Sequence, residues 1–102
     1  MLLFKKKFLD PIRSGAKCQT VRIWPTRRLR PGQAEFVPGL GRIRVTAFEA
    51  VLPADLSEED ARLDGFESRE TLLAELRALY GDRLDSLPCF RIRFAYPAPE
   101  VS

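Results

Sequence analysis

The candidate site and the start of the fold depend on residues 15–24, which read Gly15-Ala16-Lys17-Cys18-Gln19-Thr20-Val21-Arg22-Ile23-Trp24. A glycine ends a short amphipathic segment, and a strand-like run rich in β-branched and aromatic residues follows it. Because side chains alternate along a strand, Thr20 and Arg22 share one face and Lys17 shares the other with Val21. A bulge or the start of the strand at Lys17 would turn its amine towards Thr20.

Two kinds of chemistry fit these three polar side chains. A lysine beside a hydroxyl can act as the base beside a nucleophile, which would make Lys17 and Thr20 catalytic. A lysine and an arginine beside a hydroxyl can equally hold a phosphate group. A structural interpretation also stays open, since threonine is a common strand residue and lysine is common at strand edges.

The length and hydropathy indicate one domain without a membrane anchor. The chain has 102 residues, of which 45% are hydrophobic, enough for a single modest core. No apolar run approaches the roughly 18 residues of a membrane span. Lys5, Lys6 and Lys7 form a basic cluster near the N-terminus, but no apolar segment of signal-peptide length follows them. We therefore expect a soluble, cytoplasmic protein that does not bind membranes.

The charge is mildly basic and unevenly distributed. The formal net charge is +3. Among residues 1–44 only Asp10 and Glu35 oppose a basic set made of Lys5, Lys6, Lys7, Arg13, Lys17, Arg22, Arg27, Arg28, Arg30, Arg42 and Arg44. Most acidic residues fall within 49–85. This asymmetry favours a basic face directed towards a nucleotide or RNA, and an ordinary solvated surface explains it equally well.

The residue types that are missing narrow the possible chemistry. The chain has no histidine, which excludes a histidine-based triad, histidine metal ligands and histidine acid–base catalysis. Two cysteines, Cys18 and Cys89, are too few for a disulfide scaffold, and we expect no metal site and no cofactor. Asparagine is also absent and arginine outnumbers lysine, which fits a thermophile or a GC-rich genome.

Hydrophobic periodicity predicts an α+β fold. We expect strands at residues 2–8, 17–24, 33–37, 42–52 and 89–96, a short helix at 9–15, and helices that begin after Ser57 and after Ser68. Gly65 and Gly81 would end the last two helices. No regular strand–helix–strand repeat is present, so a small mixed β-barrel covered by helices at one end is the natural packing. Residues 97–102 look like a loose tail.

The ordered set of motifs resembles the ASCH domain, a branch of the PUA-like β-barrels, over roughly residues 1–95. Four segments carry the resemblance: Ile12–Lys17 with Gln19–Arg22, which is similar to the family's G-x-K-x-x-T-x-R; the turn Arg30-Pro31-Gly32-Gln33; the long strand 42–51; and Leu56–Phe66, similar to the family's L-T-x-E-D-A-x-x-[DE]-G-F. The resemblance implies a PUA-like mixed barrel of about five to six strands with two to three short helices, and a domain over residues 1–96.

The same resemblance implies a function. ASCH domains are thought to bind RNA or nucleotides in a cleft on the barrel, and some small bacterial members are amidohydrolases that deacetylate N4-acetylcytidine. Their catalytic lysine, threonine and carboxylate match Lys17, Thr20 and Asp64 by position. The enzyme members carry glutamate at the third position, and aspartate is one methylene shorter. Arg22 would then stabilise an oxyanion or hold a phosphate.

Several aromatic and basic residues are further candidates for binding the substrate or RNA. They are Arg22, Trp24, Arg27 and Arg28, and Trp24 or Tyr80 would stack on a base. Trp24 fits a core or rim position equally well, and the arginines fit a solvated loop. A nucleoside, nucleotide or RNA is the expected partner, with the protein a monomer or weak dimer. The alternative to an amidohydrolase is a non-catalytic RNA-binding module, or a ribonuclease, of the same fold.

Overall fold

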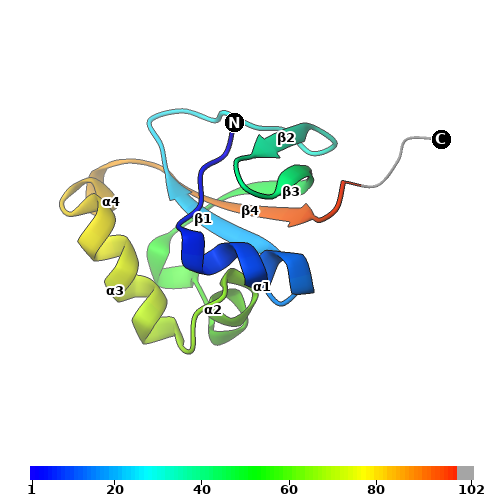
Figure 1. The fold of residues 1–102 in the computed structure, drawn as a ribbon. Coiled ribbons are helices and arrows are strands. Elements are labelled where there is room, and N and C mark those ends of the chain that lie inside the picture. Colours follow the sequence, from blue (N-terminus) through cyan, green and yellow to red (C-terminus); the bar gives the residue numbers. More distant parts are fainter. Residues whose placement is uncertain (99–102) are drawn as a thin grey trace.

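A curled sheet of four antiparallel strands forms the centre of the computed structural model, which describes residues 1–98 (Figure 1). The strands are β1 (Gln19–Ile23), β2 (Ala34–Val37), β3 (Gly41–Val51) and β4 (Cys89–Ala95), and their order across the sheet is β1-β4-β3-β2. A register shift between Val45 and Ala47 bends β3 against β4. The predicted α+β class is confirmed, as a half-barrel.

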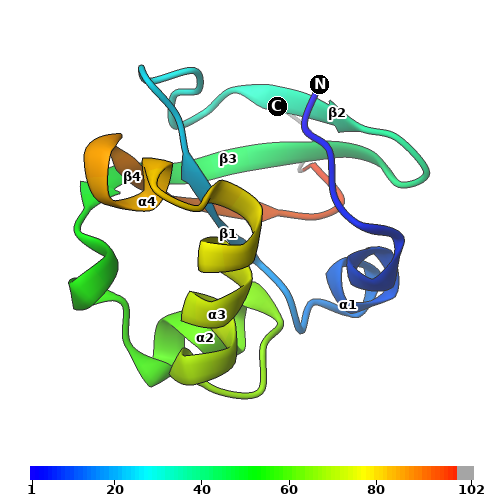
Figure 2. The same ribbon diagram turned by 90° about the vertical axis from the view of Figure 1, so that its left-hand side faces the viewer.

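The helices lie along one side of this sheet, opposite the β2–β3 hairpin, in both ribbon views (Figures 1 and 2). The four α-helices are α1 (Leu9–Ser14), α2 (Glu58–Asp64), α3 (Arg69–Tyr80) and α4 (Arg83–Ser86). Two 3-10 turns, η1 (Lys6–Phe8) and η2 (Pro53–Asp55), precede α1 and α2. The described residues therefore hold more helices and fewer strands than the sequence predicts.

The predicted strand at residues 2–8 is wrong. Residues 1–5 are extended and then turn into η1. This N-terminal segment is tied to β2 by a backbone hydrogen bond from Leu2 N to Phe36 O of 3.0 Å. Leu2 is buried and Phe4 is half-buried against the same core. The alternation of apolar residues thus reflects one buried side of a segment that runs across the sheet, and it does not require strand pairing.

The helix boundaries follow the sequence closely. The Ser57 hydroxyl accepts from Asp60 N, and the Asp60 carboxylate accepts from Ser57 N, which is a capping box at the start of α2. Ser68 and Thr71 form the same arrangement at the start of α3. Gly65 ends α2 at a φ of 92°, a conformation that residues with a side chain rarely adopt.

The buried hydrophobic residues form two clusters. One joins the N-terminal segment, α1 and the sheet: Leu2, Ile12, Leu29, Val37, Ile43, Val45, Phe48, Phe90, Ile92 and Phe94. The other joins β1 to α2, α3 and α4: Val21, Ile23, Leu56, Ala61, Leu72, Leu76, Leu84 and Cys89. Val21 and Ile23 of β1 belong to the second cluster, and Thr20 and Arg22 alternate with them along the strand.

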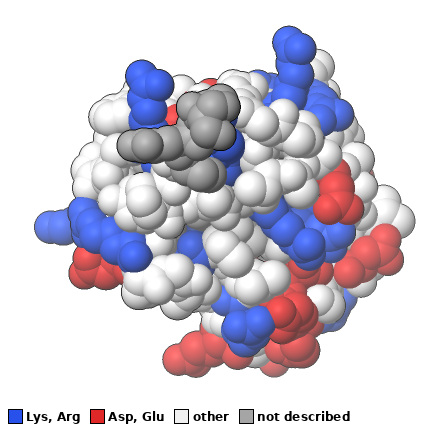
Figure 3. All heavy atoms as spheres, turned by 90° about the vertical axis from the view of Figure 1, so that its right-hand side faces the viewer, with Lys and Arg blue, Asp and Glu red and all other residues white. Residues whose placement is uncertain are grey.

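The remaining features concern the C-terminal end, the length of the helices and the distribution of surface charge. Only the first two residues of the predicted tail, 97–102, lie among the described residues, and Ala98 N still donates to Arg42 O at 3.1 Å. Within residues 1–98, no helix combines the length and the apolar character needed to cross a membrane. On the face shown in Figure 3, acidic side chains gather towards the lower, helical side, and basic side chains occupy the upper and middle parts.

Candidate functional site

A cavity of about 400 Å³ opens between the N-terminal segment, β1 and α3. Its volume falls in the range of roughly 300–1,000 Å³ that small-molecule sites occupy. The predicted catalytic residues Lys17, Thr20 and Asp64 all line it, together with Leu3, Phe4, Lys5, Phe8, Val21, Arg22, Phe66, Leu72, Glu75, Leu76, Leu79 and Tyr80. The structure therefore brings the three residues together, and their catalytic role stays a prediction.

Lys17 lies just before β1, so strand alternation does not govern where its side chain points. Its backbone N donates to Pro11 O at 3.0 Å, which holds the residue against α1. The side chain is 2% exposed, and Nζ donates to Gln19 O at 2.9 Å, to Asp64 Oδ1 at 2.5 Å and to the Asp64 backbone oxygen. Burial lowers the pKa of Lys17, and the charge of Asp64 opposes that shift.

Asp64 is the last residue of α2 and reaches Lys17 from the opposite wall of the cavity. Its side chain is 4% exposed. Burial raises the pKa of its carboxyl group, and neighbouring Lys17 works against that shift. One oxygen, Oδ1, accepts a hydrogen bond from Lys17, while the buried Oδ2 has no hydrogen-bond partner among the described residues. A buried acceptor without a partner is costly, so the unpaired Oδ2 adds to the free-energy cost of burying this carboxylate.

Thr20 and Arg22 lie two residues apart on β1 and share one face. Arg22 Nε donates to Thr20 Oγ1 at 3.0 Å, and Arg22 Nη2 donates to Leu3 O at 2.6 Å. Thr20 is 5% exposed, so its hydroxyl group is shielded from bulk water. Because the guanidinium occupies a lone pair of Oγ1, the hydroxyl proton is free to turn towards another acceptor.

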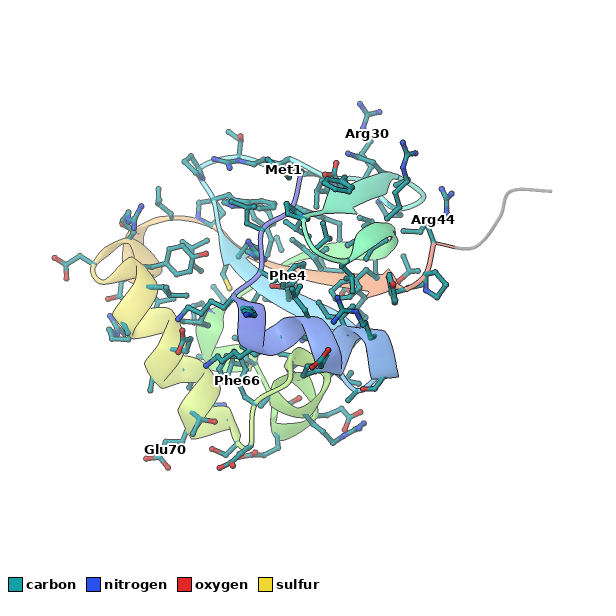
Figure 4. All side chains as sticks on the ribbon, in the orientation of Figure 1. Met1, Phe4, Arg30, Arg44, Phe66 and Glu70 are labelled. Carbon is teal, nitrogen blue, oxygen red and sulfur yellow. The ribbon has the colours of Figure 1, made fainter. Side chains whose placement is uncertain are left out.

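Aromatic rings surround the Lys17 amine. Nζ lies 4.5 Å from the ring centre of Phe8 and 5.6 Å from that of Phe4. Phe8 also packs on Phe66, with ring centres 5.5 Å apart. In Figure 4, Phe4 and Phe66 lie on either side of the start of the N-terminal helix, and Phe66 is next to α3. These rings exclude water from the amine and offer flat apolar surfaces to a planar ligand.

A second polar cluster holds α2 against β1 behind the site. Gln19, which is fully buried, donates from Nε2 to Asp60 Oδ1 at 3.2 Å, and Arg91 Nη1 donates to the same atom at 3.3 Å. Although burial works to raise it, hydrogen bonds from Ser57 and Gln19 and the charge of Arg91 hold the pKa of Asp60 below its usual range. The cluster fixes the spacing between Lys17 on one element and Asp64 on the other.

The remaining predicted binding residues are not at this cavity. Trp24 packs on Phe48 and Phe90, with ring centres 6.3 and 6.4 Å away, in the core next to β4. The guanidinium of Arg28 lies 5.0 Å from the Trp24 ring, and that of Arg27 lies 4.8 Å from Phe48. These arginines line a separate surface hollow. Of the predicted binding set, only Arg22 reaches the cavity, and Tyr80 lines it as well.

Sequence reasoning missed the aromatic wall and the pair at the cavity entrance. In the sequence, Phe4 and Phe8 belong to the predicted strand at residues 2–8, Phe66 to the segment Leu56–Phe66, and Lys5 to the N-terminal basic cluster. Lys5 in fact forms an ion pair with Glu75 of α3. Glu75 interrupts an otherwise apolar face of α3. This interruption was the one feature of the sequence that could have indicated an ion pair at the cavity entrance.

The described residues do not offer a metal site: within 1–98, no group of three or more Cys, Asp or Glu side chains is placed to bind an ion. The side chains of Lys17, Thr20, Arg22 and Asp64 supply the cavity with an amine, a hydroxyl, a guanidinium and a carboxyl group. Such a set can bind a polar group and transfer protons to and from it.

Comparisons with solved structures agree on the fold. The chain is similar to hypothetical protein PH0355, with a TM-score of 0.77 and 18% identity over 91% of this chain and 94% of that one. It is also similar to an ASCH domain from Lactobacillus crispatus JV V101, with a TM-score of 0.72 and 15% identity over 85% of this chain and 68% of that one.

A third similar structure is protein EF3133 from Enterococcus faecalis V583, with a TM-score of 0.72 and 16% identity over 87% of this chain and 66% of that one. No protein-family model and no curated protein matches the sequence. The similarity therefore rests on three-dimensional structure, and it agrees with the sequence motifs at Lys17–Arg22 and Leu56–Phe66. The chain has a small α+β fold of the ASCH type.

Proposed function

We propose that the chain binds a nucleoside or nucleotide in this cavity and removes an acetyl group from the base, as an amidohydrolase acting on substrates of the N4-acetylcytidine type. The observation that carries the proposal is the meeting of Lys17, Thr20 and Asp64, each at most 5% exposed, on the wall of one cavity. Flat aromatic walls suit a base, and an amine with a lowered pKa suits proton transfer.

The proposed reaction begins with the neutral amine of Lys17. It takes the hydroxyl proton of Thr20 as Oγ1 forms a bond to the acetamide carbonyl carbon. Arg22, which lies against Thr20, stabilises the negative charge on the carbonyl oxygen. The carbon–nitrogen bond then breaks, the leaving amine takes the proton from Lys17, and water hydrolyses the acetyl ester on Thr20. Asp64 holds Lys17 in place through its hydrogen bond from Nζ to Oδ1.

A test of the proposal compares three proteins on N4-acetylcytidine. Cytidine release is measured for the parent, for Thr20→Ala and for Thr46→Ala, which removes an exposed strand threonine away from the cavity. The expected result is turnover by the parent and by Thr46→Ala, with a loss of about 100-fold or more in Thr20→Ala. Equal turnover by Thr20→Ala, with unchanged thermal unfolding, would show that Thr20 is not the nucleophile.

One observation favours a second candidate, a binding module without catalysis. All three hydrogens of the Lys17 ammonium are used, by Gln19 O and by two oxygens of Asp64. An ammonium held in this way serves as a fixed positive charge beside the ligand. Salt-sensitive binding of cytidine nucleotides or single-stranded RNA, with no release of cytidine from the acetylated nucleoside, would favour this candidate.

A further inference from the structure

Glu75 is a charged residue on a face of α3 that is otherwise apolar. The positions that share this face, Leu72, Leu76 and Leu79, line the cavity together with Glu75. Leu72 and Leu76 are buried in the second hydrophobic cluster. The Glu75 side chain is 22% exposed and Leu79 is 48% exposed, so the carboxylate lies where this face meets solvent and is partly desolvated, which favours a polar partner.

The internal partner is Lys5, which reaches Glu75 from the N-terminal segment on the other side of the cavity. The hydrogen bond from Lys5 lowers the pKa of Glu75, so the carboxylate is ionised at neutral pH. It then acts only as an acceptor. Lys5 Nζ bonds to Oε1, and Oε2 remains able to accept from a second group.

The exposure of the charged side chains distinguishes the bottom of the cavity from its entrance. Lys17 and Asp64 are 2% and 4% exposed, Glu75 is 22% exposed and Lys5 is 51% exposed. The reacting residues therefore lie at the bottom, and the Lys5–Glu75 pair lies at the entrance. A nucleoside whose base points to Lys17 and Asp64 leaves its sugar beside Glu75.

We propose that Glu75 binds the vicinal hydroxyl groups of a ribose and so selects ribonucleosides over 2′-deoxynucleosides. A carboxylate accepts two hydroxyl protons at once, and acidic side chains that hydrogen-bond the ribose 2′-OH occur in nucleotide-binding folds. Lys5 keeps the carboxylate paired when the cavity is empty and remains beside it when the sugar is bound. This inference rests on the proposed function, because it takes the ligand to be a nucleoside.

Binding of the reaction product tests the inference without requiring turnover. Calorimetric titration with cytidine and with 2′-deoxycytidine is compared in the parent, Glu75→Gln, Lys5→Ala and Glu70→Gln. Glu70 lies on the same helix outside the cavity, and Figure 4 shows it pointing outward from the lower end of α3. Thermal unfolding of each variant shows whether it has folded, and the partial exposure of Glu75 makes folding of Glu75→Gln the expected result.

The parent and Glu70→Gln are expected to bind cytidine about 10-fold more tightly than the deoxynucleoside. Lys5→Ala keeps this preference and Glu75→Gln loses it. Equal binding of the two nucleosides by the parent, or a preference that survives in Glu75→Gln, overturns the role of Glu75 and leaves the proposed function standing. A preference lost equally in Lys5→Ala shows that only the ion pair matters and also overturns it. Binding of neither nucleoside refutes the proposed function together with this inference.

Discussion

Lys17 Nζ lies 2.5 Å from Asp64 Oδ1, although the two residues are 47 positions apart and both side chains are almost fully buried. Removing two charges from water is expensive, and although Lys17 Nζ donates three hydrogen bonds, the buried Oδ2 of Asp64 accepts none among the described residues. Burial lowers the pKa of Lys17 and raises the pKa of Asp64, so each group is pushed towards its neutral form. We therefore propose that this pair serves the chemistry of the cavity rather than the stability of the fold.

The first prediction concerns the stability of this pair. Replacing Lys17→Met or Asp64→Leu alone leaves one buried charge without its partner and lowers the free energy of unfolding by about 3–5 kcal/mol. The double variant K17M/D64L fills the same space with apolar groups and is expected to be at least as stable as the parent. Urea unfolding of the four proteins measures the coupling. Additive losses in the double variant would contradict this account.

The second prediction concerns the pH dependence of turnover. If the neutral amine of Lys17 is the base, kcat/KM rises with pH as that amine loses its proton. Because burial lowers the pKa of Lys17, the midpoint of the rise lies below pH 10.5, the ordinary lysine value. The variant Lys17→Arg stays protonated, so its residual activity should not rise over the same range. A parent rise centred at or above 10.5 would argue against a buried base.

The third prediction concerns Gly65, which follows Asp64 at a φ of 92°. A Cβ at this position would lie 3.4 Å from Lys17 Cδ and 3.4 Å from Phe8 Cδ1. We predict that Gly65→Ala lowers the free energy of unfolding by about 1–2 kcal/mol, because alanine is strained in this conformation. Gly32→Ala is a control with a similar φ of 90° and open space around its Cβ. Turnover should fall in Gly65→Ala and persist in Gly32→Ala.

The fourth prediction concerns acid stability through Asp60. Because its pKa lies below the ordinary 3.8, the ionised carboxylate stabilises the fold fully above that pH and loses this effect as the pH falls through its folded value. Asp60→Asn should therefore be about 1–2 kcal/mol less stable near pH 7, with a smaller difference near pH 3. Exposed Asp55→Asn serves as the control. If Asp60→Asn loses the same stability near pH 7 and near pH 3, the ionisation of Asp60 does not contribute to acid stability.

The part of the site that follows from local rules was predictable. Ser57 and Gly65 define the ends of α2, which puts Asp64 at the last helical position, and the glycine-to-strand transition puts Lys17 just before β1. Alternation alone assigned Lys17 to the face opposite Thr20, and the structure avoids this because β1 begins only at Gln19. The meeting of Asp64 with Lys17 came from the family resemblance, since no local pattern links residues so far apart.

The entrance and walls of the cavity were not predictable for a different reason. Leu2 and Phe4 alternate as they would in a strand, and periodicity cannot distinguish a paired strand from an extended segment buried on one side. The contact between Lys5 and Glu75 depends on where this segment crosses α3, which is a property of tertiary packing. Trp24 is half-buried against Phe48 and Phe90, in agreement with the core or rim interpretation.

The central claim is that the Lys17–Asp64 pair serves catalysis at this cavity, and the double variant K17M/D64L tests it most directly. The variant is expected to keep the fold, so any loss of activity reports on chemistry rather than on unfolding. The measurement is the release of cytidine from N4-acetylcytidine by the parent and by the double variant under the same conditions. The account predicts turnover by the parent and none above the uncatalysed rate by the folded double variant; equal rates, or no turnover by the parent, would contradict it.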